Sequence, residues 1–135
     1  MDLPVDRYPP PGTLDDVLGF ELLEVSAEGC RARFATEKRV QQPMGLVHGG
    51  AYAAMAESMV SIATWVGIQA DGSVPLGQSN NSSFLRPPRG AFVHAEGRPI
   101  HRGRSSWVWD VAFTDDEERL CAISRVTIAV RPAQT

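Results

Sequence analysis

The chain has 135 residues, 43% of them hydrophobic, which suits one compact domain with a real core. Its 16 acidic and 13 basic residues give a formal net charge of −3, which argues against a globally basic nucleic-acid-binding protein. The two cysteines, Cys30 and Cys121, lack the spacing of metal ligands. We therefore expect reduced thiols, a cytoplasmic protein and no metal site.

The first twelve residues hold four of the ten prolines and predict an irregular lead-in, residues 1–12, before a single domain over 13–135. No basic and apolar export signal is present at the N-terminus. Thr13, followed by two acidic residues, predicts the start of a helix. That helix must be short, because Gly19 follows.

Alternating apolar residues then predict two strands, a long helix and four more strands. The expected elements are strands at Phe20–Val25 and Cys30–Thr36, a loop at Glu37–Val47, a helix at Gly49–Gly67, a break at Ala70–Pro75, and strands at Leu76–Leu85, Ala91–Ile100, Ser105–Thr114 and Arg119–Val130. Strands and helices do not alternate, so we do not expect a doubly wound parallel sheet. The order predicts an α+β domain with an antiparallel sheet wrapped on one long helix.

The stretch Ala51–Ile68 approaches the length of a membrane span and carries one charge, Glu57. A central carboxylate costs about 2.5–3.5 kcal/mol on insertion scales. Much of the stretch is also Ala, Ser and Met rather than strongly apolar. We therefore expect a buried helix of a soluble domain and no membrane partner.

Glu57 is the first candidate for chemistry, because apolar neighbours on the helix predict that it is partly buried. Burial raises the pKa of a carboxyl and makes it a stronger base. Ser61 lies one turn further on and could hold the carboxylate or a water molecule. The alternative is a structural glutamate satisfied by an Arg or Ser of a neighbouring strand.

His48-Gly49-Gly50 opens the helix. Glycines there allow close approach to the free N–H groups and the positive end of the helix dipole, which suits a developing oxyanion. Simple packing of the helix end is the alternative. Gly49 and Glu57 are eight residues apart, or about 12 Å along a helix. Both act on one carbonyl only if a second helix runs antiparallel beside the first, as in a two-fold dimer.

These residues resemble the signature of hotdog-fold acyl-CoA thioesterases of the phenylacetate-pathway and 4-hydroxybenzoyl-CoA type: Gln42, five residues, His48-Gly49-Gly50, six residues, Glu57, three residues, Ser61. Two later segments, Phe84-Leu85-Arg86-Pro87 and His101–Ser105, match in register. The Gln and Glu pair is similar to the branch that acts on aromatic acyl-CoA. The resemblance covers roughly residues 15–130.

The resemblance implies a homodimer, assembled as a dimer of dimers, with an acyl-CoA substrate and no separate cofactor. Gly49 supplies an N–H to the thioester oxygen and Gln42 orients that carbonyl. Glu57 of the partner chain attacks it or activates water. Ser61 supports Glu57, and His48 lies near the sulfur. Dihydroxynaphthoyl-type enzymes carry His in the segment where this chain has Phe84-Leu85, which argues against a naphthoyl substrate.

The resemblance also gives the basic and polar segments a candidate role. Arg pairs with phosphate, so the phosphates of coenzyme A would bind at Arg residues of the turns; ordinary solvated turn residues are the alternative. The polar run Gln78–Ser83 either lines the acyl pocket or forms an exposed strand face. The candidate substrate-binding residues are Gly50, Asn81, Ser83, Phe84, Arg86, Arg102, Arg104 and Ser105, with Arg89 as a further candidate.

Two other functions fit a domain of this kind. A non-catalytic acyl-CoA sensor would bind substrate without releasing thiol, but the sequence supplies no effector domain. A dehydratase or hydratase would need an Asp–His pair, and no such pair surrounds His48. A thioester hydrolase is therefore the leading prediction.

Overall fold

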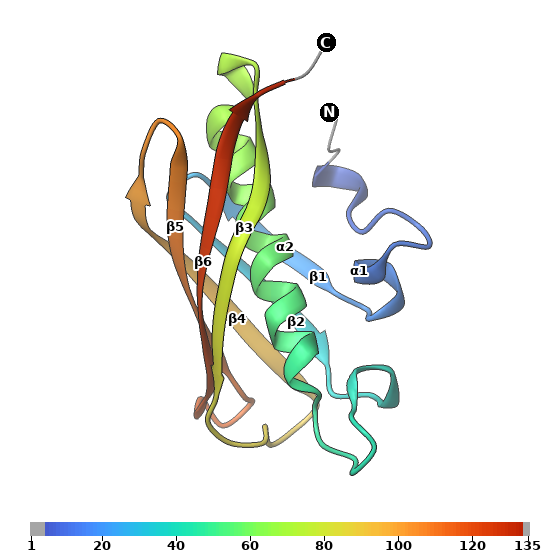
Figure 1. The fold of residues 1–135 in the computed structure, drawn as a ribbon. Helices are drawn as coiled ribbons and strands as arrows, with labels where there is room; N and C mark the ends of the chain where they lie inside the picture. Colours follow the sequence, from blue (N-terminus) through green and yellow to red (C-terminus); the bar gives the residue numbers. More distant parts are fainter. Residues whose placement is uncertain (1–4, 134–135) are drawn as a thin grey trace.

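The computed structural model describes residues 5–133 and has one antiparallel sheet curled around one long helix (Figure 1). The export-signal prediction for residues 1–4, and residues 134–135 of the predicted domain, lie outside this range. The spatial strand order is β1-β2-β4-β5-β6-β3. The elements are η1 (Val5–Arg7), α1 (Leu14–Val17), β1 (Glu21–Ser26), β2 (Gly29–Ala35), η2 (Lys38–Val40), α2 (Gly49–Ile68), η3 (Gln69–Asp71), β3 (Ser73–Phe84), β4 (Phe92–Arg102), β5 (Ser106–Thr114) and β6 (Leu120–Pro132).

Helix α2 forms the core together with the concave face of the sheet. Met55, Ala56, Met59 and Val60 are all at most 2% exposed. Gly49–Asp71 is long and apolar enough to cross a membrane, but 56% of its most apolar window is buried inside the protein. Since that burial is against the protein's own sheet, this is the core helix of a soluble domain, as predicted.

The short first helix is confirmed. The Thr13 hydroxyl accepts a hydrogen bond from the Asp16 N–H at 3.4 Å, and α1 ends at Val17. Asp15 then fastens α1 to the core helix, because its carboxylate accepts from Ser58 of α2 at 3.0 Å and from Tyr8 at 2.9 Å. The segment before α1 is thus tied to the domain by side-chain hydrogen bonds.

The predicted break at Ala70–Pro75 is wrong in its second half, since β3 begins at Ser73 and includes Pro75. β3 pairs only with β6 and is an edge of the sheet. A proline is tolerated on an edge strand because its missing N–H removes no hydrogen bond on the open side. Gly72, in the left-handed conformation at φ 70°, makes the turn into the strand.

The turn after β5 anchors the connection between β3 and β4. Asp115 is 1% exposed, and its carboxylate accepts from the backbone N–H groups of Arg89, Glu117 and Arg119 at 2.9–3.0 Å. The Arg119 guanidinium donates to it as well, at 2.9 Å. Burial by itself would raise the pKa of this carboxyl, but these hydrogen bonds hold it far below the usual range. The Asp115 carboxylate is therefore ionised, and both of its oxygens accept hydrogen bonds from these donors.

This lowered pKa predicts a stability that depends on pH. An aspartate whose pKa is depressed by folding stabilises the fold above its unfolded pKa of about 3.9, and that contribution disappears as the pH falls. Asp115→Asn should lower the melting temperature by about 10 °C at pH 7. The gap to the wild type should narrow below about pH 4.

Thermal unfolding followed by circular dichroism between pH 7 and pH 3 measures both effects. The matched control is Asp71→Asn, at an exposed position, which should leave the melting temperature unchanged. A deficit of the same size at every pH would contradict the assigned role of Asp115.

Candidate active site

One strip of α2 is not covered by the sheet. It runs through Gly50, Ala54, Glu57 and Ser61, residues spaced by three or four positions, and each is exposed or half-buried. The prediction that Glu57 is partly buried is therefore wrong for the single chain. Its neighbours Met55 and Ala56 face the core, whereas Glu57 points out of the open side next to the free edge of β3. The prediction that Ser61 shares its face is consistent with this strip.

The start of α2 leaves one backbone donor free. The Nδ1 atom of His48 accepts a hydrogen bond from the Gly50 N–H at 2.7 Å and caps the helix. Within residues 5–133 the Gly49 N–H has no acceptor. Of the two glycines predicted at this site, only Gly49 can thus donate to a substrate oxygen. His48 caps the helix through its Nδ1 atom, which accepts this hydrogen bond and leaves Nε2 as the ring N–H.

An aromatic side chain lies over this free donor. A β-carbon placed on Gly49 would lie 2.7 Å from the ring of Phe84, which is 55% exposed. The Phe84 ring in turn packs on Tyr52, with 5.9 Å between ring centroids. Burial raises the pKa of the Tyr52 hydroxyl to about 12, so this neighbour stays uncharged at neutral pH. Phe84 and Gly49 therefore form one surface.

Gln42 begins the tight turn before α2. Its side-chain oxygen accepts from the Met44 N–H, and its backbone N–H donates to Leu46 at 2.8 Å. The His48 N–H closes the loop by donating to Val40 at 2.8 Å. In the single chain, the Gln42 amide thus shapes the loop that leads into the helix, and its NH₂ group is the part left for a substrate.

Glu57 lies against the backbone of the edge strand. The space in which Gly77 would carry a β-carbon is filled by the Glu57 carboxyl, with 2.9 Å to its Cδ. Among residues 5–133 this carboxylate has no hydrogen bond or ion pair. A carboxylate that is exposed and unpaired on an otherwise apolar helix is available as a base or nucleophile.

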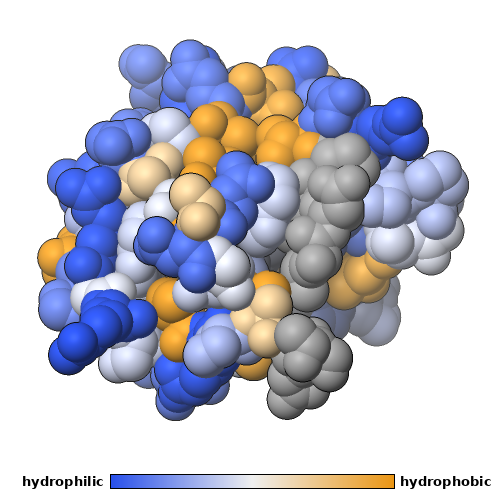
Figure 2. All heavy atoms as spheres, turned by 90° about the horizontal axis from the view of Figure 1, so that it is seen from above, coloured by the Kyte–Doolittle hydropathy of each residue, from blue (hydrophilic) through white to orange (hydrophobic). Residues whose placement is uncertain are grey.

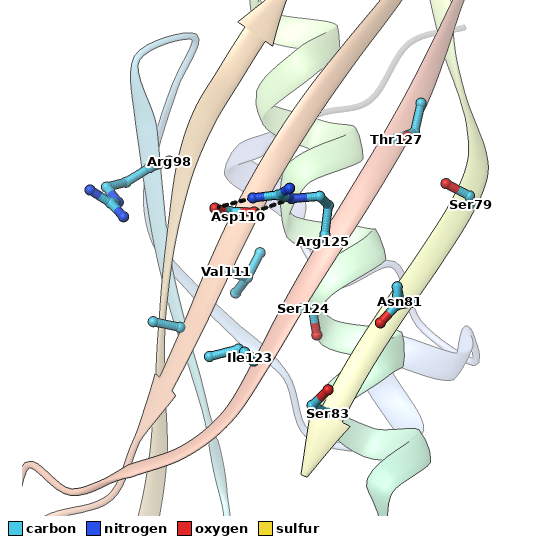
Figure 3. A pocket seen from close by; sticks show the side chains of 11 residues that line it. Ser79, Asn81, Ser83, Arg98, Asp110, Val111, Ile123, Ser124, Arg125 and Thr127 are labelled. Atoms are coloured by element: carbon cyan, nitrogen blue, oxygen red, sulfur yellow. Dashed lines mark hydrogen bonds and ion pairs between the residues drawn. The ribbon is translucent and has the colours of Figure 1, made fainter. Parts of the chain in front are cut away.

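The polar run Gln78–Ser83 is divided between the two faces of the sheet. Asn80 and Ser82 face the helix: the Asn80 amide donates to the Ala53 carbonyl at 2.9 Å, and Ser82 bonds to Asn80 at 2.8 Å. Ser79, Asn81 and Ser83 line a groove of about 590 Å³ on the opposite face of the sheet (Figure 3). The predicted binding residues Asn81 and Ser83 are therefore not brought together with Glu57 and Gly49 in one chain.

That outer groove has its own charged centre. Arg125 and Asp110 pair through two hydrogen bonds, at 2.7 and 2.9 Å. These bonds lower the pKa of the Asp110 carboxyl and keep it ionised. Figure 3 shows this pair between the β3 side chains and Arg98. The groove therefore lies on the outer face of the sheet and has an ion pair at its centre.

The arginines that cluster in the sequence lie at two ends of the molecule. Arg86 and Arg89 follow β3, at the end where α2 begins (Figure 1). Arg102 lies beside Trp107 near the other end of α2, and Arg104 lies in the same hairpin. Arg89 pairs with Glu117 at 3.5 Å and Arg102 with Glu28 at 3.6 Å. One chain therefore offers two separate basic turns.

Ser105 also belongs to the hairpin at the far end, where its carbonyl accepts from the Val130 N–H at 2.9 Å. Figure 2 looks down on this end of the molecule, which is mainly hydrophilic with a smaller apolar patch. Each basic turn is thus solvated, and the two meet at one substrate only if a second chain brings them together.

Two residues of this site were not singled out from the sequence. Gly77 appeared as a glycine within a strand, and its role is visible only because Glu57 fills the space beside it. Asn80 appeared as one polar residue among six, and only the strand register shows that it faces the helix. A glycine in a strand is the one available sign of a close approach.

The described geometry defines a class of protein: an antiparallel six-stranded sheet around one helix, with a free N–H and an unpaired carboxylate on that helix. The Thioesterase superfamily profile matches residues 44–122. A 1,4-dihydroxy-2-naphthoyl-CoA hydrolase of Listeria monocytogenes is 33% identical over 118 residues, covering 87% of this chain and 95% of the relative. The chain therefore belongs to the thioesterase superfamily.

Solved structures agree. A thioesterase of Pseudomonas aeruginosa superimposes with a TM-score of 0.86 and 33% identity, covering 90% of this chain and 88% of that one. A thioesterase of Staphylococcus aureus is 28% identical with a TM-score of 0.83, covering 88% of this chain and 98% of that one. Its solved variants replace a glutamine and a glutamate fifteen positions apart, the spacing between Gln42 and Glu57. The fold is the predicted hotdog fold, and the protein is a thioester hydrolase.

The cap at the start of α2 predicts how His48 can be replaced. His48→Ala removes the acceptor of the Gly50 N–H and should cost about 1 kcal/mol of stability. His48→Asn supplies another cap acceptor and should restore most of that loss. Urea unfolding of the two variants beside the wild type measures the difference. Equal destabilisation by both substitutions would show that the cap is not what the side chain contributes.

Proposed function

We propose that the protein hydrolyses the thioester of an acyl-CoA with an aromatic acyl group to the free acid and coenzyme A. The observation that carries this proposal is the free Gly49 N–H at the start of α2, together with the unpaired Glu57 carboxylate further along the same helix. The first can stabilise an oxyanion, and the second can activate a nucleophile or act as one. Thioester hydrolysis needs both groups.

We further propose that the two groups meet across a homodimer. Eight residues of helix separate Gly49 from Glu57 by about 12 Å, too far for both to touch one carbonyl carbon and its oxygen. β3 is an edge strand with twelve residues available for pairing. A two-fold axis at this edge would run two copies of α2 antiparallel and give two equivalent sites. Two such dimers would form the tetramer that the resemblance implies.

In such a site the thioester oxygen would accept from Gly49 of one chain, with Gln42 helping to orient the carbonyl. Glu57 of the other chain would act in one of two ways. It would take a proton from a water molecule that attacks the carbonyl, or its carboxylate would attack directly and form an anhydride that water then cleaves. Both routes break the C–S bond, release the thiol, and consume one water. Ser61 would hold the carboxylate or the water.

The aromatic acyl group is supported by the surroundings of Gly49. Phe84 offers an exposed ring directly beside the free N–H, and its edge and face suit the packing of a second ring. A relative is named for a naphthoyl-CoA substrate. For the phosphates of coenzyme A we propose Arg86 at one end of the molecule and the hairpin of Arg102 and Arg104 at the other, joined by dimer formation. Reduced cysteines fit a cytoplasmic enzyme.

Removing the carboxylate tests the first proposal. Glu57→Gln keeps the size of the side chain but not its charge, and should lower kcat by at least about 10³-fold. Thiol release from benzoyl-CoA, phenylacetyl-CoA and straight-chain acyl-CoA esters is the measurement, and the wild type should prefer the aromatic esters. Glu96→Gln, an exposed strand position, is the control and should leave kcat unchanged. Undiminished turnover by Glu57→Gln would remove Glu57 from the mechanism, and acyl-CoA binding without turnover by the wild type would favour a sensor.

A shared site predicts complementation between two inactive variants. Gly49→Pro deletes the free N–H at the first position of α2, where the helix backbone accommodates proline, and displaces the half-exposed Phe84 ring that lies beside it. A heterodimer of Gly49→Pro with Glu57→Ala has one site with both groups intact. Co-expressed and separated by two different tags, this heterodimer should recover about half of the wild-type kcat per dimer. Complete inactivity of a correctly assembled heterodimer would show that each site lies within one chain.

A further inference from the structure

We propose that Gly77 is a positioning residue. Because it has no side chain, the Glu57 carboxylate can pack against the backbone of the edge strand, and this contact holds the carboxylate in place. The inference rests on the function proposed above, because it assigns Glu57 to the chemistry. It adds a residue of the neighbouring strand, which neither the motif around α2 nor the sequence comparison singles out.

The three heavy atoms nearest to the space beside Gly77 all belong to Glu57. A β-carbon at Gly77 would lie 2.9 Å from Cδ, 3.0 Å from Oε2 and 3.3 Å from Cγ of Glu57. Carbon atoms of neighbouring side chains pack no closer than about 3.5 Å. A side chain at position 77 and the present position of the Glu57 carboxylate therefore exclude each other.

Backbone conformation does not explain this glycine. The described glycines with positive φ are Gly12, Gly19, Gly45, Gly72 and Gly90. Gly77 lies within β3, pairs with Ile128 next to a β-bulge, and is not among the glycines with positive φ. Alanine fits such a backbone without strain, so the free space is the feature that the site uses.

A β-bulge brings Gly77 to the helix. Gly77 pairs with Ile128 and Ser79 with Thr127, which leaves Gln78 as an extra residue. In a regular strand, residues three apart point to opposite faces. Because of the bulge, Gly77 and Asn80 both face α2, and the Asn80 amide donates to the Ala53 carbonyl at 2.9 Å. The edge strand is thus fixed to the helix one turn before Glu57.

No hydrogen bond or ion pair holds the Glu57 carboxylate in the described chain. A glutamate side chain has three rotatable bonds, and a reactive group must stay within about 0.5 Å of its productive place. Packing against the Gly77 backbone supplies this restriction, with the bulge and Asn80 fixing the strand that it packs against.

Gly77→Ala tests the proposal, because the added methyl group displaces a flexible side-chain end and not the backbone. We expect kcat for thiol release to fall about 10- to 100-fold while KM stays within about two-fold. The matched control is Gly29→Ala, where a β-carbon would make an ordinary 3.4 Å contact with the Gly97 carbonyl. That control should keep full activity. Unchanged kcat in Gly77→Ala would overturn the proposal.

A double-mutant cycle separates positioning from general damage. In a Glu57→Asp background the shorter side chain withdraws from position 77, so Gly77→Ala should lower the remaining kcat by less than about two-fold. Equal losses in both backgrounds would assign the effect to the strand and overturn the proposal.

A readout independent of activity comes from thermal unfolding. In a Glu57→Ala background the space is empty, and Gly77→Ala should raise the melting temperature by about 2–4 °C through its effect on the unfolded chain. In the presence of Glu57 this gain should be lost. An equal gain in both backgrounds would deny the contact. Absence of thioesterase activity in the wild type would refute the proposed function, while this cycle would still test the contact.

Discussion

The sheet of this protein does not close around its central helix, and the arrangement of the site depends on that opening. β1 and β3 are its two edges, and the strip of α2 that contains Glu57 and Ser61 faces the gap next to β3. A closed sheet would have buried Glu57 among apolar side chains, where a charged carboxylate is costly. The gap lets an almost wholly apolar helix carry one carboxyl group that is exposed and has no ion pair in the described chain.

The start of the same helix divides its backbone donors between structure and chemistry. Every helix begins with N–H groups that have no partner within the helix. Here His48 satisfies that of Gly50, and the turn around Gln42 holds the approach to the helix. The Gly49 N–H is left without an acceptor in the described chain, under the edge of Phe84. Because the cap binds the Gly50 N–H, the Gly49 N–H is the one of the two candidate donors that remains for a substrate. The cap also fixes the direction in which this N–H points.

The sequence predicted where helices and strands begin and end better than it predicted which elements lie next to each other in space. The apolar run after His48 and the cap at Thr13 are local signals, and both helices begin where predicted. The pairing of β3 with β6 is not a local property, and it decides that Glu57 is exposed and that Pro75 belongs to a strand. The exposure of Glu57 could not be read from its neighbours, because α2 is lined with small and apolar residues on most sides.

Nearness in sequence was also a poor guide to the basic residues. Arg89 and Arg102 belong to one cluster in the sequence, but β4 runs between them for eleven residues, or about 35 Å. An extended strand keeps its two ends far apart, so residues on either side of it do not meet in one chain. The motif around α2 was predictable for the opposite reason, since a helix keeps residues eight positions apart within about 12 Å.

The polar character of β3 also affects the solubility of the free chain. An exposed edge strand is a template on which other chains can add strands and aggregate, and natural sheets protect such edges with polar residues, prolines and bulges. β3 has all three, in its polar run from residue 78 to residue 83, in Pro75, and in the bulge at Gln78. An edge of this kind discourages unrelated strands. It leaves the strand open mainly to a partner whose own edge carries the same irregularity in the complementary register, a requirement that the second copy of the chain in the proposed dimer would meet.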